Sequence, residues 1–467
     1  MMGRMALTAI RAGWPHSREP GTLQPIEPGN DRGGQQAATR ASRRPIAVDL
    51  FAGAGGLSLG FEQAGFDILA AVEMDPVHAI VHEFNFPYGK TLCRDISGIS
   101  GDEIRARSSI GDNEVAVVIG GAPCQGFSLI GKRQLDDPRN SLLGEFARLV
   151  VELQPAFFVL ENVAGLTVGK HRQLLDELVN VFTDAGYFVR LPFNVLQAAE
   201  FGVPQSRNRL FLLGARDGVK IPDYPSPITR SRATSGAPRS SDSALPLCPS
   251  VSEALTDIPD ADGFPELLIH DSVRTDLGEP SEYARKLREQ EFDATNHSRL
   301  REFDPGVLTG SMRTSHTDRS IERFQTTTPG ATEPTSRFLR LHPDGICNTL
   351  RAGTASDRGA HTSPRPIHPW LPRVITVREA ARLHGYPDWF RFHTTKWHGF
   401  REIGNSVPPP LARAVAAEVV RVGDYQIPPG EATSLGNPLV LGFTATQAER
   451  HFDIHHRVIP QRTRKAA

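Results

Sequence analysis

The stretch IAVDLFAGAGGLSLGF, residues Ile46–Phe61, decides the fold that the sequence predicts. Its first part, Ile46–Phe51, is an apolar run typical of a buried strand, and glycines end it at once. The residues that follow, Leu57–Ala64, have the apolar spacing of a helix. Glycines between a strand and a helix let the backbone approach a ligand, and the helix presents free N–H groups there. The stretch therefore predicts the first unit of an α/β fold, with a ligand site at the turn.

The same alternation of apolar runs and helices continues along the chain. We expect further strands at Phe66–Val72, Val115–Ile119, Ala156–Leu160, Tyr187–Leu196 and Arg209–Gly214. We expect further helices at Pro76–Phe84, Ser141–Leu153 and His171–Ala185. Short strands separated by helices of this size are typical of βαβ units, because parallel neighbours need a long crossover connection. The sequence therefore predicts an α/β fold with a parallel sheet.

Composition and charge describe an ordinary globular protein and indicate no partner by themselves. The chain has 467 residues, of which 39% are hydrophobic and 22% charged, with a formal net charge of −1. This length suits two or more domains, and any nucleic-acid surface has to be local. The four cysteines stand far apart, which predicts neither disulfides nor a metal site. No apolar run approaches the ~20 residues of a membrane helix, so we expect a cytoplasmic protein without membrane contact.

Changes in composition predict the domain organisation. Residues 1–44 are rich in Pro, Gly and Arg, and we expect them to be a flexible N-terminal arm. Residues 45–216 carry the alternating pattern, whereas residues 217–375 are irregular and rich in Pro, Ser, Thr, Asp and Arg. Regular patterning returns in residues 376–425, which we expect to rejoin the first ordered part. Residues 426–467 form a C-terminal extension broken by Pro and Gly.

The irregular segment carries a local excess of arginine. Between Thr295 and Ile375 there are eleven arginines, seven acidic residues and no lysine. Guanidinium groups suit phosphates and guanine edges, although a solvated arginine-rich loop accounts for the same composition. The segment ends at a predicted helix with a capping box, in which Thr376 is the N-cap and Glu379 stands three residues later.

Acidic residues follow the glycine turn at the ends of the next predicted strands. Glu73 stands 20 residues after Gly53, where a carboxylate can accept from both hydroxyls of a ribose. Asp95 comes later and suits an adenine amino group. The turn lacks the G-x-G-x-x-G spacing of dinucleotide sites, and the chain has no G-x-x-x-x-G-K-[ST] motif. This acidic arrangement favours S-adenosylmethionine, with a purely structural glycine turn as the alternative.

A single thiol follows an apolar strand in the sequence GGAPCQGFS, residues Gly120–Ser128. Cys124 stands at the sheet edge where ligands bind in open α/β folds, although free cysteines often behave as small buried hydrophobes. Glu161 ends the next predicted strand, and Arg207 and Arg209 lie on one face of a β segment. A thiol, a carboxyl group and a guanidinium pair at strand ends suit attack on an electron-poor heterocycle.

With these residues in place, the chain resembles the cytosine-5 DNA methyltransferases, in their bacterial modification-enzyme form. The matching blocks occur in the order of that family: DLFAGAGG, EMDP, GGAPCQGFS, ENV, QSRNR, REAARLHGYPD and IGNSVPP. They lie within residues 46–214 and 376–422. The resemblance implies a Rossmann-like, S-adenosylmethionine-dependent methyltransferase domain, into which residues 217–375 are inserted as a smaller, irregular target-recognition domain.

The resemblance also implies catalytic roles. Cys124 would attack carbon 6 of the target cytosine, so that carbon 5 becomes enamine-like and accepts the sulfonium methyl. Glu161 would contact ring nitrogen 3 and the exocyclic amine, and Arg209 with Arg207 would secure the ring oxygen and the catalytic loop. Loss of the carbon-5 proton and expulsion of the thiolate would then restore the ring.

For the cofactor, the resemblance implies that Phe51 stacks on adenine, Glu73 binds the ribose and Asp95 binds the adenine amine. Asn405 and Val407 would return from the C-terminal part to complete the methionine end. The full set of implied cofactor contacts is Phe51, Gly53, Gly55, Gly56, Leu57, Glu73, Met74, Asp95, Ile96, Pro123, Asn405 and Val407.

The target cytosine has to leave the duplex, because this chemistry cannot occur inside a base stack. The loop Gln125–Arg139 contains glycines and basic residues that suit a mobile lid in contact with phosphates. In the irregular segment, GICNTLRAG resembles a Thr-Leu region that the family places near the flipped base. The implied DNA contacts are Gln125, Ser128, Arg133, Thr349, Leu350 and Arg351.

Other functions fit the sequence less well. An RNA methyltransferase acting on tRNA cytosines is the nearest alternative, but a long recognition segment favours duplex DNA. A catalytically silent DNA-binding regulator has no need of the thiol, acid and arginine set, and a nicotinamide dehydrogenase is disfavoured by the glycine spacing. We expect a monomer that uses S-adenosylmethionine and double-stranded DNA, without a metal, and with a cognate restriction endonuclease as a candidate partner.

Overall fold

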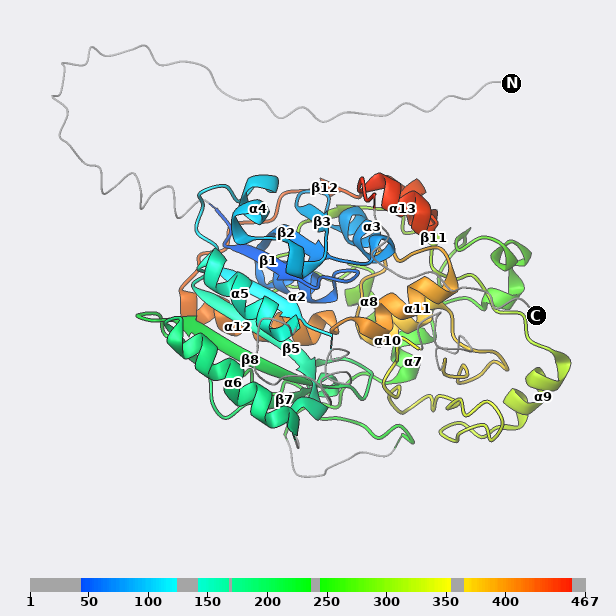
Figure 1. Cartoon of the computed structure of the whole chain (residues 1–467). Helices are drawn as coiled ribbons and strands as arrows, with labels where there is room; N and C mark the ends of the chain where they lie inside the picture. The colour runs from blue at the N-terminus through cyan, green and yellow to red at the C-terminus, as the bar shows by residue number, and fades with distance from the viewer. Residues whose placement is uncertain (1–42, 124–141, 168–169, 237–243, 354–364, 456–467) are drawn as a thin grey trace, which may run out of the picture. The chain divides into compact units, whose positions relative to one another are not determined.

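The computed structural model describes residues 43–123, 142–167, 170–236, 244–353 and 365–455 (Figure 1). These residues belong to one compact unit, Arg43–Ala467. Of the expected N-terminal arm, residues 1–42 lie outside the described residues. Arg44, which the sequence assigns to the arm, is instead buried, and its guanidinium donates to the carbonyl oxygens of Gly65 and Glu62 at 3.0 and 2.9 Å.

The centre of this unit is a sheet with the strand order β3-β2-β1-β4-β5-β8-β6, in which β7 also pairs with β8. The parallel strands are β1 (Ile46–Leu50), β2 (Asp67–Glu73), β3 (Lys90–Cys93), β4 (Val117–Gly121) and β5 (Phe157–Val163). The other strands are β6 (Tyr187–Val189), β7 (Asn194–Gln197) and β8 (Asn208–Arg216). The α/β fold with parallel strands that the sequence predicts is confirmed.

The last strands depart from a purely parallel sheet. Helix α6 (Lys170–Asp184) carries the chain from β5 to β6, and both of these strands run antiparallel to β8. Strands β5 and β6 therefore run in the same direction but are not adjacent. Strand β8 lies between them and is antiparallel to both. Strands that follow one another through short connections pair antiparallel, since only long crossovers allow parallel pairing.

Helices cover both faces of the sheet (Figure 1). On one face are α4 (Gly101–Arg107), α5 (Leu142–Leu153) and α6, and on the other are α2 (Gly56–Ala64) and α12 (Pro409–Gly423). Side chains alternate between the two cores along each strand: Phe158 of β5 joins the first core, and Phe157 joins Leu57 of α2 in the second. Burial on both faces explains why the strands are continuous apolar runs in the sequence.

The C-terminal helices return to the first half of the chain. Helices α10 (Val377–His384) and α11 (Lys396–Asn405) precede α12, which lies against α2. A Cβ atom at Gly60 of α2 would lie 2.3 Å from the Cβ of Ala412, so only glycine allows this approach. The predicted capping box of α10 is confirmed, because Thr376 Oγ1 accepts from the Glu379 N–H at 3.2 Å and Glu379 Oε2 accepts from the Thr376 N–H at 2.7 Å.

The described part of residues 217–375 contains short elements. They are α7 (Val251–Leu255), α8 (Glu282–Leu287), α9 (Asp318–Thr326), β9 (Val273–Arg274), β10 (Arg301–Glu302) and β11 (Val307–Leu308), besides single 3₁₀ turns. This segment is joined to the first half of the chain by Arg301, which makes two hydrogen bonds to the Glu62 carboxylate of α2 at 2.8 and 2.7 Å. Both side chains are fully buried.

The described residues after α12 pack on several elements, among them α3 (Pro76–Asn85). The short strand β12 (Thr433–Ser434) pairs in parallel with β10, and α13 (Ala445–His451) contacts α3. Nε2 of His451 lies 2.6 Å from Oε1 of Glu83. The described part of the C-terminal extension is therefore folded onto the rest of the unit.

Candidate active site

The register of the parallel strands brings their carboxyl ends to one edge of the sheet. Leu50, the last residue of β1, pairs with Val72 of β2 and Gly120 of β4, and Gly121 pairs with Glu161 of β5. The strand order reverses at β1, because the chain continues to β2 on one side and later to β4 on the other. In open α/β sheets ligands bind at such a switch point, outside the carboxyl ends. The residues that follow β1, β2, β4 and β5 therefore form the candidate site.

The turn after β1 has an unusual backbone conformation, in which two glycines and one residue with a side chain adopt a positive φ. Gly53 and Gly55 have φ angles of 55° and 104°, and Phe51 has a φ of 64°. A positive φ is uncommon for a residue with a Cβ atom, and such residues cluster at functional sites. The Gly53 N–H donates to Oε2 of Glu73 at 2.8 Å. A Cβ at Gly53 would meet no described residue within 4 Å, so among these residues the turn leaves open space beside the carboxylate.

The Glu73 carboxylate ends β2 beside this turn. Its Oε1 accepts from the Asp75 N–H at 2.8 Å, so each oxygen holds one backbone donor and keeps a second acceptor position. Burial raises the pKa of Glu73. The next residue, Met74, is exposed. Asp95 is also exposed, and its Oδ1 accepts from the N–H and the hydroxyl of Ser97 at 3.0 and 2.8 Å.

The other residues expected at the cofactor come from several elements, and one of them, Val407, is placed at the start of α2. A Cβ at Gly56 would lie 2.5 Å from the carbonyl oxygen of Val407, so the C-terminal part reaches the glycine turn. Val407 is buried, whereas Asn405, the last residue of α11, is exposed. Ile96 is buried after β3, and Pro123 is exposed after β4.

A chain of buried polar side chains lies beneath the turn, and the sequence did not predict it. Ser58 Oγ donates to Oδ2 of Asp49 at 2.5 Å and lies 2.9 Å from Nε2 of His82, whose Nδ1 lies 3.0 Å from Oγ1 of Thr91. Because Ser58 gives its only proton to Asp49, His82 donates from Nε2 and Thr91 donates to Nδ1. Burial lowers the pKa of His82 to about 3, which keeps the imidazole neutral.

Asp49 lies at one end of this hydrogen-bonded chain of side chains, and one of its two carboxylate oxygens takes no part in it. Its Oδ1 is buried and has no hydrogen-bond partner among the described residues. Burial raises the pKa of Asp49 to about 7, against the opposing hydrogen bond from Ser58. The sequence signal that could have identified Asp49 is a single acidic residue in an otherwise apolar strand. Burying a carboxylate costs free energy, so such a residue indicates a functional role.

Glu161, at the end of β5, forms an ion pair with Arg209 of β8. Oε1 and Nε are 2.6 Å apart, and the side chains are 9% and 12% exposed. Arg209 pairs with Val163, which makes Glu161 and Arg209 diagonal neighbours on one face of the sheet. A Cβ at Gly121 would lie 2.9 Å from Oε2 of Glu161, so glycine leaves room for the carboxylate. Burial raises the pKa of Glu161, while the charges of Arg209 and Arg207 oppose this rise.

Arg207 has partners of a different kind. Its buried guanidinium donates to the main-chain oxygens of Leu350, Gly404 and Ser406 at 2.8, 2.8 and 2.7 Å. The sequence suggested that Arg207 and Arg209 act together as one anchor. In the structure Arg209 faces a carboxylate, whereas Arg207 binds two backbone segments, at Leu350 and at Gly404–Ser406, that are far from it in the chain.

The expected Thr-Leu region lies beside Arg207. Thr349 Oγ1 donates to the carbonyl oxygen of Ser206 at 2.6 Å, and the Leu350 N–H donates to Oε1 of Gln205 at 3.2 Å. Leu350 is buried, and Arg351 is exposed. Of the three expected DNA contacts in this region, Arg351 is thus the one with a solvent-exposed side chain.

The expected nucleophile and the loop after it lie outside the described residues. This applies to Cys124, Gln125, Ser128 and Arg133. The chain that leads to them is held by Asn162, whose Nδ2 donates to the carbonyl oxygen of Ala122 at 3.0 Å. Asn162 follows Glu161, so one strand end carries the acid and also holds the backbone two residues before Cys124.

The described cysteines differ in character from a reactive thiol. Cys93, Cys248 and Cys347 are buried, and burial raises the pKa of each, which disfavours the thiolate. Within the described ranges, no group of His, Cys, Asp and Glu side chains is placed to hold a metal ion. No helix in those ranges is long and apolar enough to cross a membrane.

Comparisons with known proteins agree with this geometry. Residues 46–421 match the family model of the C-5 cytosine-specific DNA methylases. The chain is 54% identical over 422 residues to the type II methyltransferase M.XorII of Xanthomonas oryzae pv. oryzae, which covers 90% of this chain and 95% of that protein. It is 34% identical over 386 residues to the type II methyltransferase M1.HphI of Haemophilus parahaemolyticus, which covers 80% of this chain and 86% of that protein.

A solved structure supports the same relationship. The chain is similar to a protein assigned as a DNA modification methyltransferase encoded within an E. coli prophage, with a TM-score of 0.64 and 33% sequence identity. This similarity covers 81% of the present chain and 99% of the other. The chain therefore belongs to the C-5 cytosine-specific DNA methylases and is a DNA cytosine methyltransferase.

Proposed function

We propose that Cys124, Glu161 and Arg209 carry out the methylation of carbon 5 of a cytosine in duplex DNA. The observation that supports this proposal is the Glu161–Arg209 ion pair, which lies beside the end of β4 from which the chain runs to Cys124. A thiol that adds to carbon 6 of cytosine pushes electrons toward ring nitrogen 3, which then needs a proton. The raised pKa of Glu161 suits a carboxyl group that holds this proton.

The proposed reaction uses these residues in sequence. The thiolate of Cys124 forms a bond to carbon 6, while Glu161 gives its proton to ring nitrogen 3. Arg209 holds the carboxyl group in place and lies beside the ring oxygen. Carbon 5 becomes nucleophilic and accepts the methyl group. Carbon 5 then gives its proton to a water molecule, the electron pair of that C–H bond forms the carbon 5–carbon 6 double bond as the thiolate leaves carbon 6, and ring nitrogen 3 returns its proton to Glu161.

The residues at the ends of β1 and β2 fit S-adenosylmethionine, which supplies an electrophilic methyl group when bound. The buried Oδ1 of Asp49 lacks a partner among the described residues, and an unpaired carboxylate oxygen favours a cationic ligand. Glu73 keeps one acceptor position on each oxygen for two ribose hydroxyls. Gly53 leaves open space next to that carboxylate.

Phe51, whose strained backbone lies at the start of the same turn, is half-buried against the first core, and we propose that its ring also stacks on adenine. Asp95 is exposed, with its carboxylate available to the adenine amine. The remaining cofactor contacts that we propose are Gly55, Gly56, Leu57, Met74, Ile96, Pro123, Asn405 and Val407.

We propose that Arg207 is a positioning residue. Its three hydrogen bonds hold Leu350 and the turn at Gly404 and Ser406 next to the strand that carries Arg209. The C-terminal part of the cofactor site and the Thr-Leu region are therefore placed by one guanidinium.

Residues 217–375 are the proposed target-recognition domain, inserted between residues 45–216 and 376–425 of the catalytic domain. The proposed DNA contacts are Gln125, Ser128, Arg133, Thr349, Leu350 and Arg351, around a cytosine turned out of the duplex. Because relatives of this chain are type II methyltransferases, we propose that a restriction endonuclease of the same sequence specificity is its partner in the cell. The protein is proposed to act as a monomer in the cytoplasm.

Transfer of a labelled methyl group from S-adenosylmethionine tests the proposed function. Wild-type protein, Cys124→Ser and the matched control Cys248→Ser are incubated with duplex DNA of mixed sequence and, in parallel, with tRNA. We expect label in DNA with the wild type and the control, because Cys248 is buried in a small apolar cluster with Ala199 and Ile346. We expect none with Cys124→Ser.

Undiminished transfer by Cys124→Ser would contradict the proposed nucleophile. Label in tRNA and not in DNA would favour the RNA-modifying alternative. Sequencing the methylated DNA then identifies the recognition sequence and the cytosine within it.

A further inference from the structure

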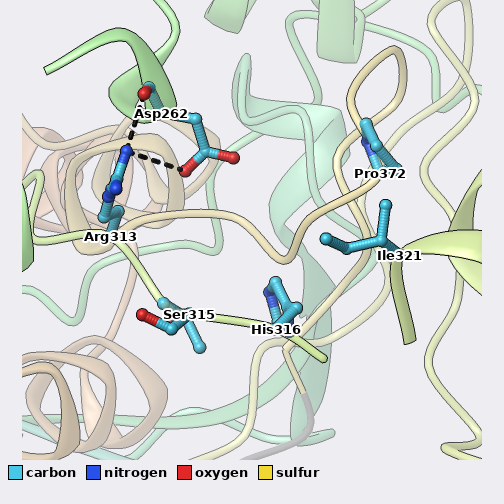
Figure 2. Close-up of a pocket in the computed structure, with 7 residues that line it drawn as sticks. Asp262, Arg313, Ser315, His316, Ile321 and Pro372 are labelled. Carbon is cyan, nitrogen blue, oxygen red and sulfur yellow. Dashed lines mark hydrogen bonds and ion pairs between the residues drawn. The ribbon is translucent and has the colours of Figure 1, made fainter. Parts of the chain in front are cut away.

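A pocket of about 310 Å³ lies in the irregular segment and shares no lining residue with the candidate active site (Figure 2). Arg313 lies on one side, where its guanidinium donates to the carbonyl oxygen of Asp262 at 2.6 Å. Figure 2 shows Ile321 and Pro372 on the opposite side, with residues of the Arg313 loop between them. The wall of the pocket thus combines hydrogen-bonding groups with apolar surface, as the edges of bases require.

Two cations, Arg365 and Lys396, stand beside this pocket and have no acidic partner among the described residues. Nη1 of Arg365 lies 3.5 Å from Oγ1 of Thr314, and Nζ of Lys396 donates to the carbonyl oxygen of Arg313 at 2.6 Å. Over the described part of the chain, neither cation has a carboxylate oxygen within 4.0 Å. Burial lowers the pKa of Lys396, and the charge of Arg365 lowers it further. Two neighbouring cations that no acid of the described ranges neutralises favour a bound anion.

His316 places a hydrogen-bond donor in the same pocket. Its Nε2 accepts from the Val374 N–H at 3.3 Å, and burial lowers its pKa, so the imidazole is neutral near pH 7. Nδ1 then carries the ring proton. Together with the hydroxyl of Ser315, this N–H can reach acceptor atoms on a base edge.

Helix α11 joins the pocket to the candidate active site. Lys396 begins this helix, Phe400 lies under the Arg365 guanidinium at 4.5 Å, and Gly404 accepts a hydrogen bond from Arg207. At ~1.5 Å per residue, the helix from Lys396 to Gly404 spans about 12 Å. That length corresponds to roughly three to four base pairs of a duplex. A rigid helix therefore sets the distance between the pocket and the backbone that Arg207 holds beside the candidate active site.

From this geometry we infer that Arg365 and Lys396 bind a backbone phosphate of duplex DNA, and that Ser315 and His316 contact bases a few pairs from the target cytosine. The inference rests on DNA methylation by this chain and adds the residues that hold and read the flanking sequence. Phosphate contacts position a protein on DNA and base contacts specify the sequence, so the two parts have separate effects.

The salt dependence of DNA binding tests the phosphate contact. We expect Arg365→Gln and Lys396→Gln to weaken binding of cognate and unrelated duplexes by the same factor. Each is expected to lower the slope of log Kd against log salt concentration by about 1. Arg365→Lys retains the charge and is expected to retain the slope. The matched control is Lys220→Gln, because Lys220 is exposed at the opposite edge of the sheet and should leave the slope unchanged.

Sequence preference tests the base contacts. We expect Ser315→Ala and His316→Ala to reduce discrimination among duplexes that differ near the target cytosine by roughly 10-fold, with the salt slope unchanged. Thermal unfolding like that of the wild type shows that each variant is folded. If the wild type methylates DNA while these variants keep both its salt slope and its preference, the inference is overturned and the methylation stands. A wild type that methylates no duplex would overturn the function on which the inference rests.

Discussion

Glu161 and Arg209 form an ion pair across two antiparallel strands, with Oε1 and Nε 2.6 Å apart. The pair lies at the strand ends where the candidate site is built, and it is largely shielded from solvent. Burial raises the pKa of Glu161, while the neighbouring guanidinium charges oppose that rise. The protonation of this carboxyl group therefore depends on two neighbouring cations, of which Arg209 is also hydrogen-bonded to it, and mutation can test that dependence.

Replacing Arg209 by Leu is expected to lower methylation near pH 7 by about 10²-fold, because a charged partner of the reacting ring is lost. Without that charge the pKa of Glu161 rises further, so a carboxyl group that acts in its protonated form keeps its proton to higher pH. The falling limb of the pH–rate profile, measured in single turnovers, should move to higher pH. Arg207→Lys is the comparison, since Arg207 binds backbone oxygens. It should lower the rate at every pH and keep the shape of the profile.

Replacing Gly60 by Ala is expected to destabilise the protein by roughly 1–3 kcal/mol. The added Cβ would lie 2.3 Å from the Cβ of Ala412 and 2.7 Å from the Arg413 nitrogen, so α2 and α12 have to separate. Chemical denaturation measures the change. Gly263→Ala is the matched control, because a Cβ there meets nothing within 4 Å. Equal stability of the two variants would show that α2 and α12 can accommodate the added methyl group.

The buried pair Glu62–Arg301 is expected to dominate the attachment of the irregular segment to α2. Arg301→Met leaves the Glu62 carboxylate buried without its cation, which costs about 3–5 kcal/mol. Adding Glu62→Gln removes the unpaired charge and should restore part of the loss. The exposed pair Arg172–Asp176 is the control, since Arg172→Ala should change the free energy of unfolding by less than about 1 kcal/mol. No recovery in the double variant would indicate that packing, and not charge, accounts for the loss.

The free energy of unfolding is expected to fall as pH rises through the range from about 4 to about 7. Burial raises the pKa of Asp49 to about 7, so the folded state binds a proton that the unfolded state has already released. The contribution is complete below the unfolded pKa and is lost as pH passes the folded value. It amounts to at most roughly 4 kcal/mol.

Asp49→Asn, measured by denaturation without cofactor, should make this pH dependence smaller. Part of it should remain, because burial also raises the pKa of Glu402 to about 7. A variant with the wild-type pH dependence would show that Asp49 is not protonated in the folded state.

The glycines after β1 show how far the sequence could be interpreted. The run of glycines predicted a turn that admits a ligand, and the positive φ of Gly53 and the open space beside it agree with a site there. Gly56 looks the same in the sequence, but a Cβ there would meet Tyr386 and Val407. Its lack of a side chain is explained by packing against segments more than three hundred residues away in the chain. A local sequence pattern cannot distinguish a glycine that leaves space for a ligand from one that allows close packing, because both positions require the absence of a Cβ.

The sequence by itself determined the α/β class, most strands and helices of the sheet, and the positions of Glu73 and Glu161 at or near strand ends. None of its predicted ranges corresponds to β3 or α4, and it predicted β6 and β7 as one strand. Periodicity and turn residues act over a few residues, and parallel strands necessarily gather their carboxyl ends at one edge. Only the tertiary structure decided the partners of the buried arginines. Arg207 binds Leu350 across 143 residues and Ser406 across 199, and Arg301 binds Glu62 across 239. Such contacts depend on how distant segments approach in space, and an arginine in a buried ion pair looks the same in a sequence as one that faces solvent.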